Sequence, residues 1–320
     1  MKLYFAPLEG ITGYIYRNAY YDFFGKGVDK FFTPFIGVGQ NGLSKSRIWE
    51  DIATEHNKKM TVVPQLLSNN GNITKDYVNQ LADLGYQEIN LNLGCPYQTV
   101  VSKKKGAGLL AEPERLVEFL DELFEGMRNS ERSGVKTAHI SVKTRIGMTS
   151  SDEFERLLEI YNQYPLSELI IHPRVREEFY DGHPHLESFA LALEYSKAPV
   201  CYNGDIFTKK DYQNLVEQFP KVDRVMLGRG PLSNPGLISE LLTGEKATKE
   251  QLLAFHNRLY ADYLQVMSGE KNTLFKMKEL WNYMQFSFKD CEKQIKKIRK
   301  AQRASEYEAA VRELFTGEIQ

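Results

Sequence analysis

The sequence has few cysteines, no long apolar run and almost no net charge. Cys95, Cys201 and Cys291 lie far apart and form no Cys-x-x-Cys pair, which argues against a disulfide framework and a structural zinc site. No apolar stretch approaches the length that spans a bilayer, and Met1-Lys2 leads into no charged leader with an apolar run and cleavage site. We therefore expect a cytoplasmic protein with no membrane anchor and no stable protein partner.

The composition indicates a globular chain. Hydrophobic residues make up 42% and charged residues 26% of the 320 residues, so a disordered or collagen-like chain is excluded. This length fits one barrel-sized domain with an appendage, or two ordinary domains. The formal net charge of −1 means that any nucleic-acid binding has to come from a local basic patch.

Short apolar runs alternate with helical patterns along the first 240 residues. The eight runs are Leu3–Ala6, Lys30–Pro34, Thr61–Leu67, Glu88–Leu93, Ala138–Arg145, Glu168–His172, Pro199–Asn203 and Arg224–Gly228. Helical spacing of apolar residues lies between them, at Asn72–Leu84, Glu112–Met127, Asp152–Tyr161, Leu186–Tyr195 and Thr208–Phe219. Regular alternation of this kind predicts a parallel sheet with crossover helices.

The position of the distinctive residues favours a (β/α)8 TIM barrel over an open, doubly wound sheet. They follow most of the predicted strands, whereas an open sheet would gather its special residues at one switch point. Beyond about residue 241 the strand pattern ends, and Thr248–Met267, Asn272–Phe286 and Asp290–Phe315 read as helices. We predict a catalytic barrel at 1–240 followed by a small all-α domain at 241–320.

Two glycine turns and two basic residues at strand ends suggest an anionic cofactor. Asn203-Gly204-Asp205 and Gly228-Arg229-Gly230 follow the last two strands, where barrels commonly bind phosphate, although tight turns alone would also use these glycines. Lys143 ends a strand with apolar flanks, so it faces either an anionic ligand such as a reduced flavin or a structural ion pair. His172 is either a donor to that cofactor or a core histidine.

A metal site is not predicted. His183 and His185 could join His172, but no carboxylate or third histidine follows at a recognised ligand spacing.

Cys95 stands in the segment Asn92-Leu93-Gly94-Cys95-Pro96, where a predicted strand gives way to a loop. Free cysteines are often small buried hydrophobes, and we treat Cys201 and Cys291 in this way. A thiol in a loop can donate a proton to a carbon centre, whereas a nucleophile would need an adjacent base that the sequence does not identify. We therefore favour Cys95 as a general acid. The basic run Lys103, Lys104 and Lys105 follows it and is either a contact for phosphates or a solvated loop.

The ordered set of these motifs resembles the tRNA-dihydrouridine synthase family. The matching segments are Ala6–Gly10, Asn92–Pro96 with Gly106-Ala107-Gly108, Lys143–Arg145, His172–Arg174, Asn203–Asp205 and Gly228–Gly230. The resemblance implies an FMN-containing barrel that uses NADPH to reduce the C5–C6 double bond of selected uridines in tRNA. It also implies hydride transfer from reduced FMN to C6 and protonation of C5 by Cys95.

The resemblance assigns further roles residue by residue. Asn92 matches a residue that holds the base, and Arg145 and Arg174 are suited to the base or the RNA. The positions expected to bind FMN are Pro7, Leu8, Glu9, Gln65, Lys143, His172, Asn203, Gly204, Asp205, Gly228 and Arg229. The segment after His172 keeps the expected Tyr and Gly spacing but lacks the tryptophan that should follow.

The helical tail would help to bind the RNA. Its basic residues gather between Lys289 and Arg303, a pattern that on composition alone is more often a solvated helix face. The lysines that we expect to face tRNA phosphates are Lys293, Lys296, Lys297 and Lys300.

Two alternatives remain open at the level of the sequence. The first is an FMN barrel acting on a free pyrimidine or another small conjugated substrate, which would have no evident use for the basic tail. The second is an RNA-binding or folding factor that keeps the barrel and has lost catalysis, which the intact Cys95, Lys143 and glycine turns disfavour.

Overall fold

The computed structural model of the protein describes residues 1–39, 42–43 and 47–320. Its centre is a sheet of ten strands in the order β3-β5-β6-β7-β8-β9-β10-β1-β2-β4, and every strand pair is parallel. The strands are β1 Lys2–Phe5, β2 Lys30–Phe32, β3 Ile36–Gly37, β4 Val62–Val63, β5 Gln65–Leu67, β6 Glu88–Leu93, β7 His139–Gly147, β8 Glu168–Val175, β9 Val200–Asn203 and β10 Arg224–Leu227.

Two interrupted strands close this sheet into a barrel. β4 and β5 are separated only by Pro64, whose nitrogen has no hydrogen for the ladder. β2 pairs with β4, and β3, which continues β2 along the chain, pairs with β5. With β2 and β3 taken as one barrel strand and β4 and β5 as another, the ten segments occupy eight positions around a closed ring. The predicted (β/α)8 barrel is confirmed.

The barrel interior is apolar in the middle and ionic at the amino-terminal end of the strands. Buried side chains from several strands meet in the middle, namely Tyr4, Ala6, Phe32, Val63, Ile170, Cys201 and Met226. At the amino-terminal end, the buried Glu168 carboxylate accepts hydrogen bonds from Tyr4 (2.8 Å), Lys30 (3.0 Å) and Arg224 (2.9 Å). These contacts tie the amino-terminal ends of β1, β2, β8 and β10 together inside the barrel.

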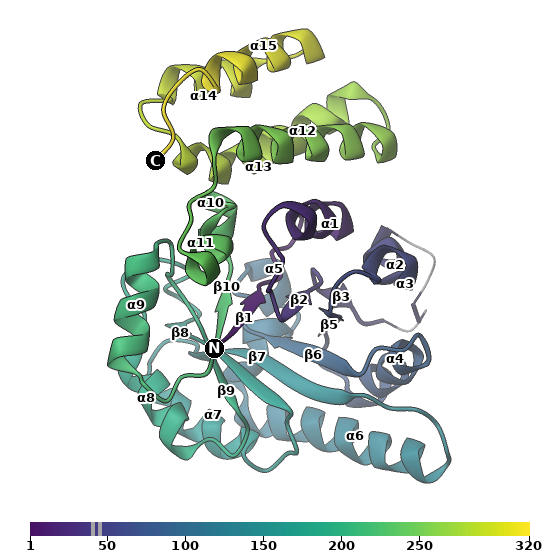
Figure 1. The fold of residues 1–320 in the computed structure, drawn as a ribbon. Helices are drawn as coiled ribbons and strands as arrows, with labels where there is room; N and C mark the ends of the chain where they lie inside the picture. The colour runs from purple at the N-terminus through teal and green to yellow at the C-terminus, as the bar shows by residue number, and fades with distance from the viewer. Residues whose placement is uncertain (40–41, 44–46) are drawn as a thin grey trace.

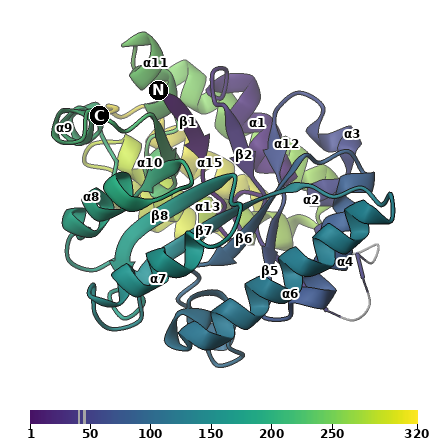
Figure 2. The ribbon, with the colours of Figure 1, turned by 90° about the horizontal axis from the view of Figure 1, so that it is seen from below.

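Helices surround the ring (Figures 1 and 2). Their buried apolar side chains form one core cluster with those of the strands. Local capping fixes several starts: the Asn70 side chain accepts the Ile73 N–H, and Thr208 and Asp211 form a capping box. The helices of this part are α1 Tyr14–Phe23, α2 Arg47–Ile52, α3 Thr54–Asn57, α4 Gly71–Asp83, α5 Gln98–Val101, η1 Gly106–Ala111, α6 Pro113–Arg132, α7 Glu153–Tyr161, α8 Leu186–Tyr195, α9 Lys209–Gln218, α10 Arg229–Ser233 and α11 Leu237–Thr243.

The carboxyl-terminal helices form a separate layer on one side of the barrel (Figure 1). They are α12 Lys249–Val266, α13 Glu270–Met284, η2 Gln285–Ser287, α14 Glu292–Lys300 and α15 Ala304–Leu314. Phe255 of α12 packs against the rings of Tyr16 and Phe24 from the barrel side, at centroid distances of 5.7 and 5.4 Å. Helix α11 spans the predicted boundary between residues 240 and 241, and that boundary stays a prediction.

The expectation of one helix over Asp290–Phe315 is wrong. Helix α14 ends at Lys300, and Ala301 has an extended ψ of 131°. The Ala301 carbonyl is turned toward α13, where it accepts a hydrogen bond from the Lys278 ammonium. Because this tertiary contact takes the carbonyl out of the helical direction, the chain turns and α15 starts at Ala304.

Candidate active site

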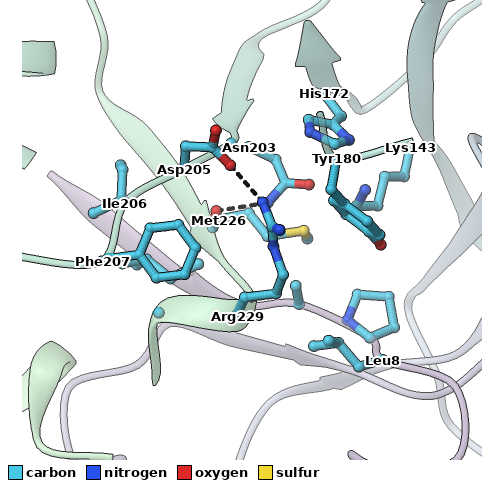
Figure 3. Close-up of a pocket in the computed structure, with 16 residues that line it drawn as sticks. Leu8, Lys143, His172, Tyr180, Asn203, Asp205, Ile206, Phe207, Met226 and Arg229 are labelled. Atoms are coloured by element: carbon cyan, nitrogen blue, oxygen red, sulfur yellow. Dashed lines mark hydrogen bonds and ion pairs between the residues drawn. The ribbon is translucent and has the colours of Figure 1, made fainter. Parts of the chain in front are cut away.

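A pocket opens at the carboxyl ends of β1, β7, β8, β9 and β10 (Figure 3). All but two of the residues predicted to bind a cofactor line it, and the two exceptions are Glu9 and Gln65. The lining residues are Ala6, Pro7, Leu8, Lys143, His172, Tyr180, Asn203, Gly204, Asp205, Ile206, Phe207, Met226, Leu227, Gly228, Arg229 and Gly230. The strand ends thus bring together residues that are more than 200 positions apart in the sequence.

The two glycine turns pack directly against neighbouring backbone and side chains. A Cβ atom on Gly230 would lie 2.0 Å from the Ile206 carbonyl oxygen, and one on Gly228 would lie 3.4 Å from the Ala6 Cβ. Only glycine lets the turn after β10 lie against the turn after β9. The turns therefore leave main-chain atoms on the pocket wall, which suits a phosphate group.

Lys143 points into the pocket from β7 (Figure 3). Among residues 1–39, 42–43 and 47–320, no carboxylate forms an ion pair with its ammonium group. Burial, and then the nearby Arg145 guanidinium, lower the pKa of Lys143 to about 8. An ammonium in this position gains an interaction as soon as an anionic group enters the pocket.

His172 is buried at the end of β8, and its pKa lies well below the ordinary value. Burial is the main cause, and the cations Arg145 and Lys143 add to it. The imidazole is therefore neutral at pH 7, with one ring nitrogen as a donor and the other as an acceptor. It can hydrogen-bond a neutral polar edge of a ligand without adding charge.

Asp205 joins two arginines on the pocket wall. Its carboxylate lies 2.6 Å from Arg174 Nη2 and 2.5 Å from Arg229 Nη2. The Arg229 guanidinium in turn lies between two rings, 4.2 Å from the Tyr180 centroid and 5.3 Å from the Phe207 centroid (Figure 3). These contacts fix the direction of Arg229 across the mouth of the pocket.

Cys95 follows β6, next to the strand that carries Lys143. The side chain of Asn92 organises the turn there, because its Oδ1 accepts the N–H groups of Gly94 (3.1 Å) and Cys95 (2.9 Å). Asn92 Nδ2 donates to Gln65 Oε1 at 2.7 Å, and Gln65 donates to Asn90 at 2.8 Å. Gln65 thus lies behind the cysteine loop and supports it, outside the pocket lining.

The Cys95 thiol is shielded from solvent, with an exposed fraction of 8%. Burial raises the pKa of Cys95 above its ordinary value, so the thiol carries its proton at neutral pH. Gly106 of η1 makes the close packing possible, because its φ is +57° and a Cβ there would lie 3.0 Å from the Cys95 Cβ. A protonated, positioned thiol suits a general acid better than a nucleophile.

Arg145 and Arg174 are buried and hold backbone carbonyls. Arg145 donates to the carbonyls of Gly94 (3.0 Å), Val175 (2.8 Å) and Phe179 (2.6 Å), and burial lowers its pKa to about 10. Arg174 donates to the carbonyls of Asp181 and Gly182. Both residues therefore anchor the loop after β8, and their contact with RNA stays a prediction.

The lysine loop and the predicted tail lysines lie on the surface. Lys103 is exposed, Lys104 pairs with Glu112 at 2.8 Å, and Lys105 donates to the Val38 carbonyl at 3.1 Å. The four tail residues Lys293, Lys296, Lys297 and Lys300 are all exposed on α14. Lys297 pairs with Glu313 at 2.6 Å.

A larger groove lies between the barrel and the helical layer. Glu9 is on its wall, away from the pocket, together with residues of α12, α13 and α14. Its basic residues are Lys276, Lys278 and Arg299. None of the three was predicted individually as a site residue, although Arg299 lies in the basic run between Lys289 and Arg303. Tyr180 and Phe207 of the pocket were also missed as site residues, and only the Tyr and Gly spacing after His172 pointed toward Tyr180.

Among the described residues, no group of three or more His, Cys, Asp and Glu side chains is arranged to hold a metal ion. No helix in the described part of the chain has the length and apolar character needed to cross a membrane.

Comparison with known proteins gives one family. The family model of dihydrouridine synthase matches residues 4–317. A probable tRNA-dihydrouridine synthase from Staphylococcus epidermidis is 29% identical over 81% of this chain and 77% of its own length. A tRNA-dihydrouridine(16) synthase from Pseudomonas syringae is 27% identical over 77% of this chain and 76% of its own length.

Solved structures share the fold at low identity. Histamine dehydrogenase from a Rhizobium species has a TM-score of 0.57 and 11% identity, covering 87% of this chain and 49% of that protein. A variant of NCR from Zymomonas mobilis has a TM-score of 0.51 and 13% identity, covering 79% of this chain and 90% of that one. At this identity the likeness concerns the barrel fold alone.

Proposed function

We propose, from the premise that this chain belongs to the dihydrouridine synthase family, that it reduces the C5–C6 double bond of uridine in tRNA to 5,6-dihydrouridine. The cofactor in this proposal is FMN and the reductant is NADPH. The observation that carries it is a buried Cys95 thiol in the turn after β6, because β6 is the neighbour of β7, the strand that carries Lys143 into a pocket walled by two glycine turns.

The residues present fit FMN. The Lys143 ammonium, which has no carboxylate partner in the described part of the chain, suits the N1–O2 edge of the flavin, which becomes negative on reduction. The neutral His172 can hydrogen-bond the same ring. The turns at Gly204 and Gly228 and the Arg229 side chain suit the phosphate. The apolar side chains of Leu8 and Met226 supply a surface for the ring system.

FMN, when bound and reduced, supplies the hydride that uracil accepts at C6. The C4 carbonyl then takes up charge, and C5 needs a proton. Cys95 donates it from Sγ, and the resulting thiolate is reprotonated from solvent before the next turnover. Burial favours this role, because it keeps the proton on sulfur until a basic carbon is present.

Asn92 has two tasks in this proposal. Its Oδ1 holds the Gly94 and Cys95 N–H groups, and one Nδ2 hydrogen goes to Gln65. A primary amide has a second N–H, and we assign that donor to a uracil carbonyl. The same side chain would then align the base with the thiol that protonates it.

The target uridine has to leave its stack to reach the pocket. We assign the surrounding RNA to the groove between the barrel and the helical layer, where Lys276, Lys278 and Arg299 lie. The exposed lysines of α14 and Lys103 would contact phosphates farther out.

The test combines a spectrum with a product map. The purified protein should show flavin absorption, and incubation with NADPH and unmodified tRNA should add two hydrogens at a uridine, detected by mass spectrometry. Flavin without a tRNA product but with turnover of free uracil would favour the small-substrate enzyme. A colourless protein that binds no added FMN would refute the cofactor assignment.

A further inference from the structure

The loop between β8 and α8, residues 176–185, is closed on itself by one carboxylate. Glu178 Oε2 accepts the Val175 N–H at 2.8 Å, where the strand ends, and Glu178 Oε1 lies 2.7 Å from His185 Nε2, where the helix begins. The exposed fractions of the Glu178 and His185 side chains are 27% and 30%. One side chain therefore ties together the two ends of the loop.

The same loop carries Tyr180 to the flavin pocket. Phe179 has a positive φ of 50°, an uncommon conformation for a bulky residue, and its carbonyl accepts Arg145 Nη2 at 2.6 Å. Next in the chain, the Tyr180 ring lies 4.2 Å from the Arg229 guanidinium and 6.0 Å from the His172 ring (Figure 3). Tyr180 is still 43% exposed, and the Arg145 guanidinium also lies 5.7 Å from its ring centroid.

We propose that Glu178 is a positioning residue whose contact with His185 latches loop 176–185 and holds Tyr180 as a cover over the flavin pocket. The inference rests on the proposed function, because the cover has a purpose only if FMN binds there. It also explains the shape of the loop: the ion pair fixes the ends, and the buried arginines fix the middle.

The latch depends on protonation. The charged groups that face the His185 ring are Glu178 from its own loop, at 2.7 Å, and Glu187 from α8, at 3.3 Å. The hydrogen bond from Glu178 is the main reason that the pKa of His185 is raised above its ordinary value. A raised pKa means that the contact is strongest when the imidazole is charged and weakens as pH rises through that pKa.

The experiment measures FMN affinity of the FMN-free protein by quenching of flavin fluorescence at pH 6.5. We expect Glu178→Ala and His185→Gln each to weaken FMN binding by about three- to tenfold, the range for a partly exposed, charge-assisted contact. Glu177→Ala is the matched control, because Glu177 is an exposed acid on the same loop whose side chain forms no hydrogen bond or ion pair among the described residues. It should leave FMN affinity unchanged.

Two further readouts separate positioning from general damage to the fold. Tyr180→Ala should weaken FMN binding. The double variant Tyr180→Ala/Glu178→Ala should bind FMN as Tyr180→Ala does, because the cover over the pocket is already absent. The ratio of wild-type to Glu178→Ala affinity should fall toward one by pH 9. Three results would overturn the proposal. They are losses of FMN affinity that add in the double variant, a ratio of wild-type to Glu178→Ala affinity that does not change with pH, and a Glu178→Ala affinity equal to that of Glu177→Ala.

Hydrogen exchange keeps the latch testable without flavin. In the FMN-free protein at pH 6.5, Glu178→Ala should speed amide exchange within residues 176–185, and Glu177→Ala should not. Unchanged exchange in Glu178→Ala overturns the latch alone. A wild-type protein that binds no FMN overturns the flavin cover together with the proposed function.

Discussion

Replacement of Lys143 by methionine should make the FMN-free protein more stable while removing its ability to hold the cofactor. Lys143 is partly buried, and its ammonium has no carboxylate partner among the described residues. Burial lowers its pKa from 10.5 to about 8. At about 1.36 kcal/mol for each pH unit, this difference corresponds to about 3 kcal/mol of destabilisation at pH 7, and partial solvent access reduces the expected gain for Lys143→Met to about 2 kcal/mol.

The stability gained by Lys143→Met should decrease as pH rises. Below pH 8 the lysine is charged in both the folded and the unfolded protein, so the folded state carries the full cost of burial. Between pH 8 and 10.5 the folded protein loses the proton first, and wild-type stability rises relative to the variant. The advantage of Lys143→Met should therefore be largest at pH 7 and less than half as large at pH 9.5.

Urea denaturation of the FMN-free proteins at the two pH values measures this difference. Lys103→Met is the matched control, because Lys103 is exposed, and its effect should stay within about 0.5 kcal/mol. FMN affinity of Lys143→Met should be strongly reduced. Two results would refute the interpretation of Lys143 as a buried ammonium without a carboxylate partner. One is a Lys143→Met variant that is less stable than wild type at pH 7, and the other is a gain in the free energy of unfolding that does not shrink as pH rises.

Three other predictions concern the thiol, its packing and the RNA surface. Cys95→Ala should bind FMN as the wild type does, since Cys95 is outside the pocket lining, but should form dihydrouridine about 10²- to 10⁴-fold more slowly; equal rates by mass spectrometry would rule out the acid role. Gly106→Ala should lower the free energy of unfolding in urea by about 2 kcal/mol, because it combines a positive φ with a 3.0 Å contact to Cys95. Gly134 also has a positive φ, but a Cβ there would meet open space, so Gly134→Ala should lower the free energy of unfolding by only about half as much. Equal losses of stability in the two variants would contradict the packing explanation. Joint replacement of the tail lysines by glutamine should weaken tRNA binding and flatten its salt dependence in filter-binding titrations. An unchanged dependence of tRNA affinity on salt would mean that these lysines form a solvated face. The residues are Lys293, Lys296, Lys297 and Lys300.

In the helical tail, apolar spacing predicted two helices but not the break between α14 and α15. Apolar spacing predicted the helices at Thr248–Met267 and Asn272–Phe286 within a few residues, because that spacing is a local property. The break at Ala301 was missed, since its carbonyl is drawn to Lys278 on another helix. Likewise, the sequence could not indicate that Lys276 and Arg299 share a groove with Glu9.

The sequence by itself determined the barrel and most of its pocket. The distinctive residues follow the predicted strands in the sequence, and a parallel barrel brings the carboxyl ends of its strands to one face. The order of the strands was therefore enough to predict that Lys143, His172 and Gly228 share a site. The tertiary structure decided what those residues contact. Arg174 pairs with Asp205, Gln65 supports Asn92, and Tyr180 lies on Arg229, because side-chain partners depend on distances between loops that are remote in the chain.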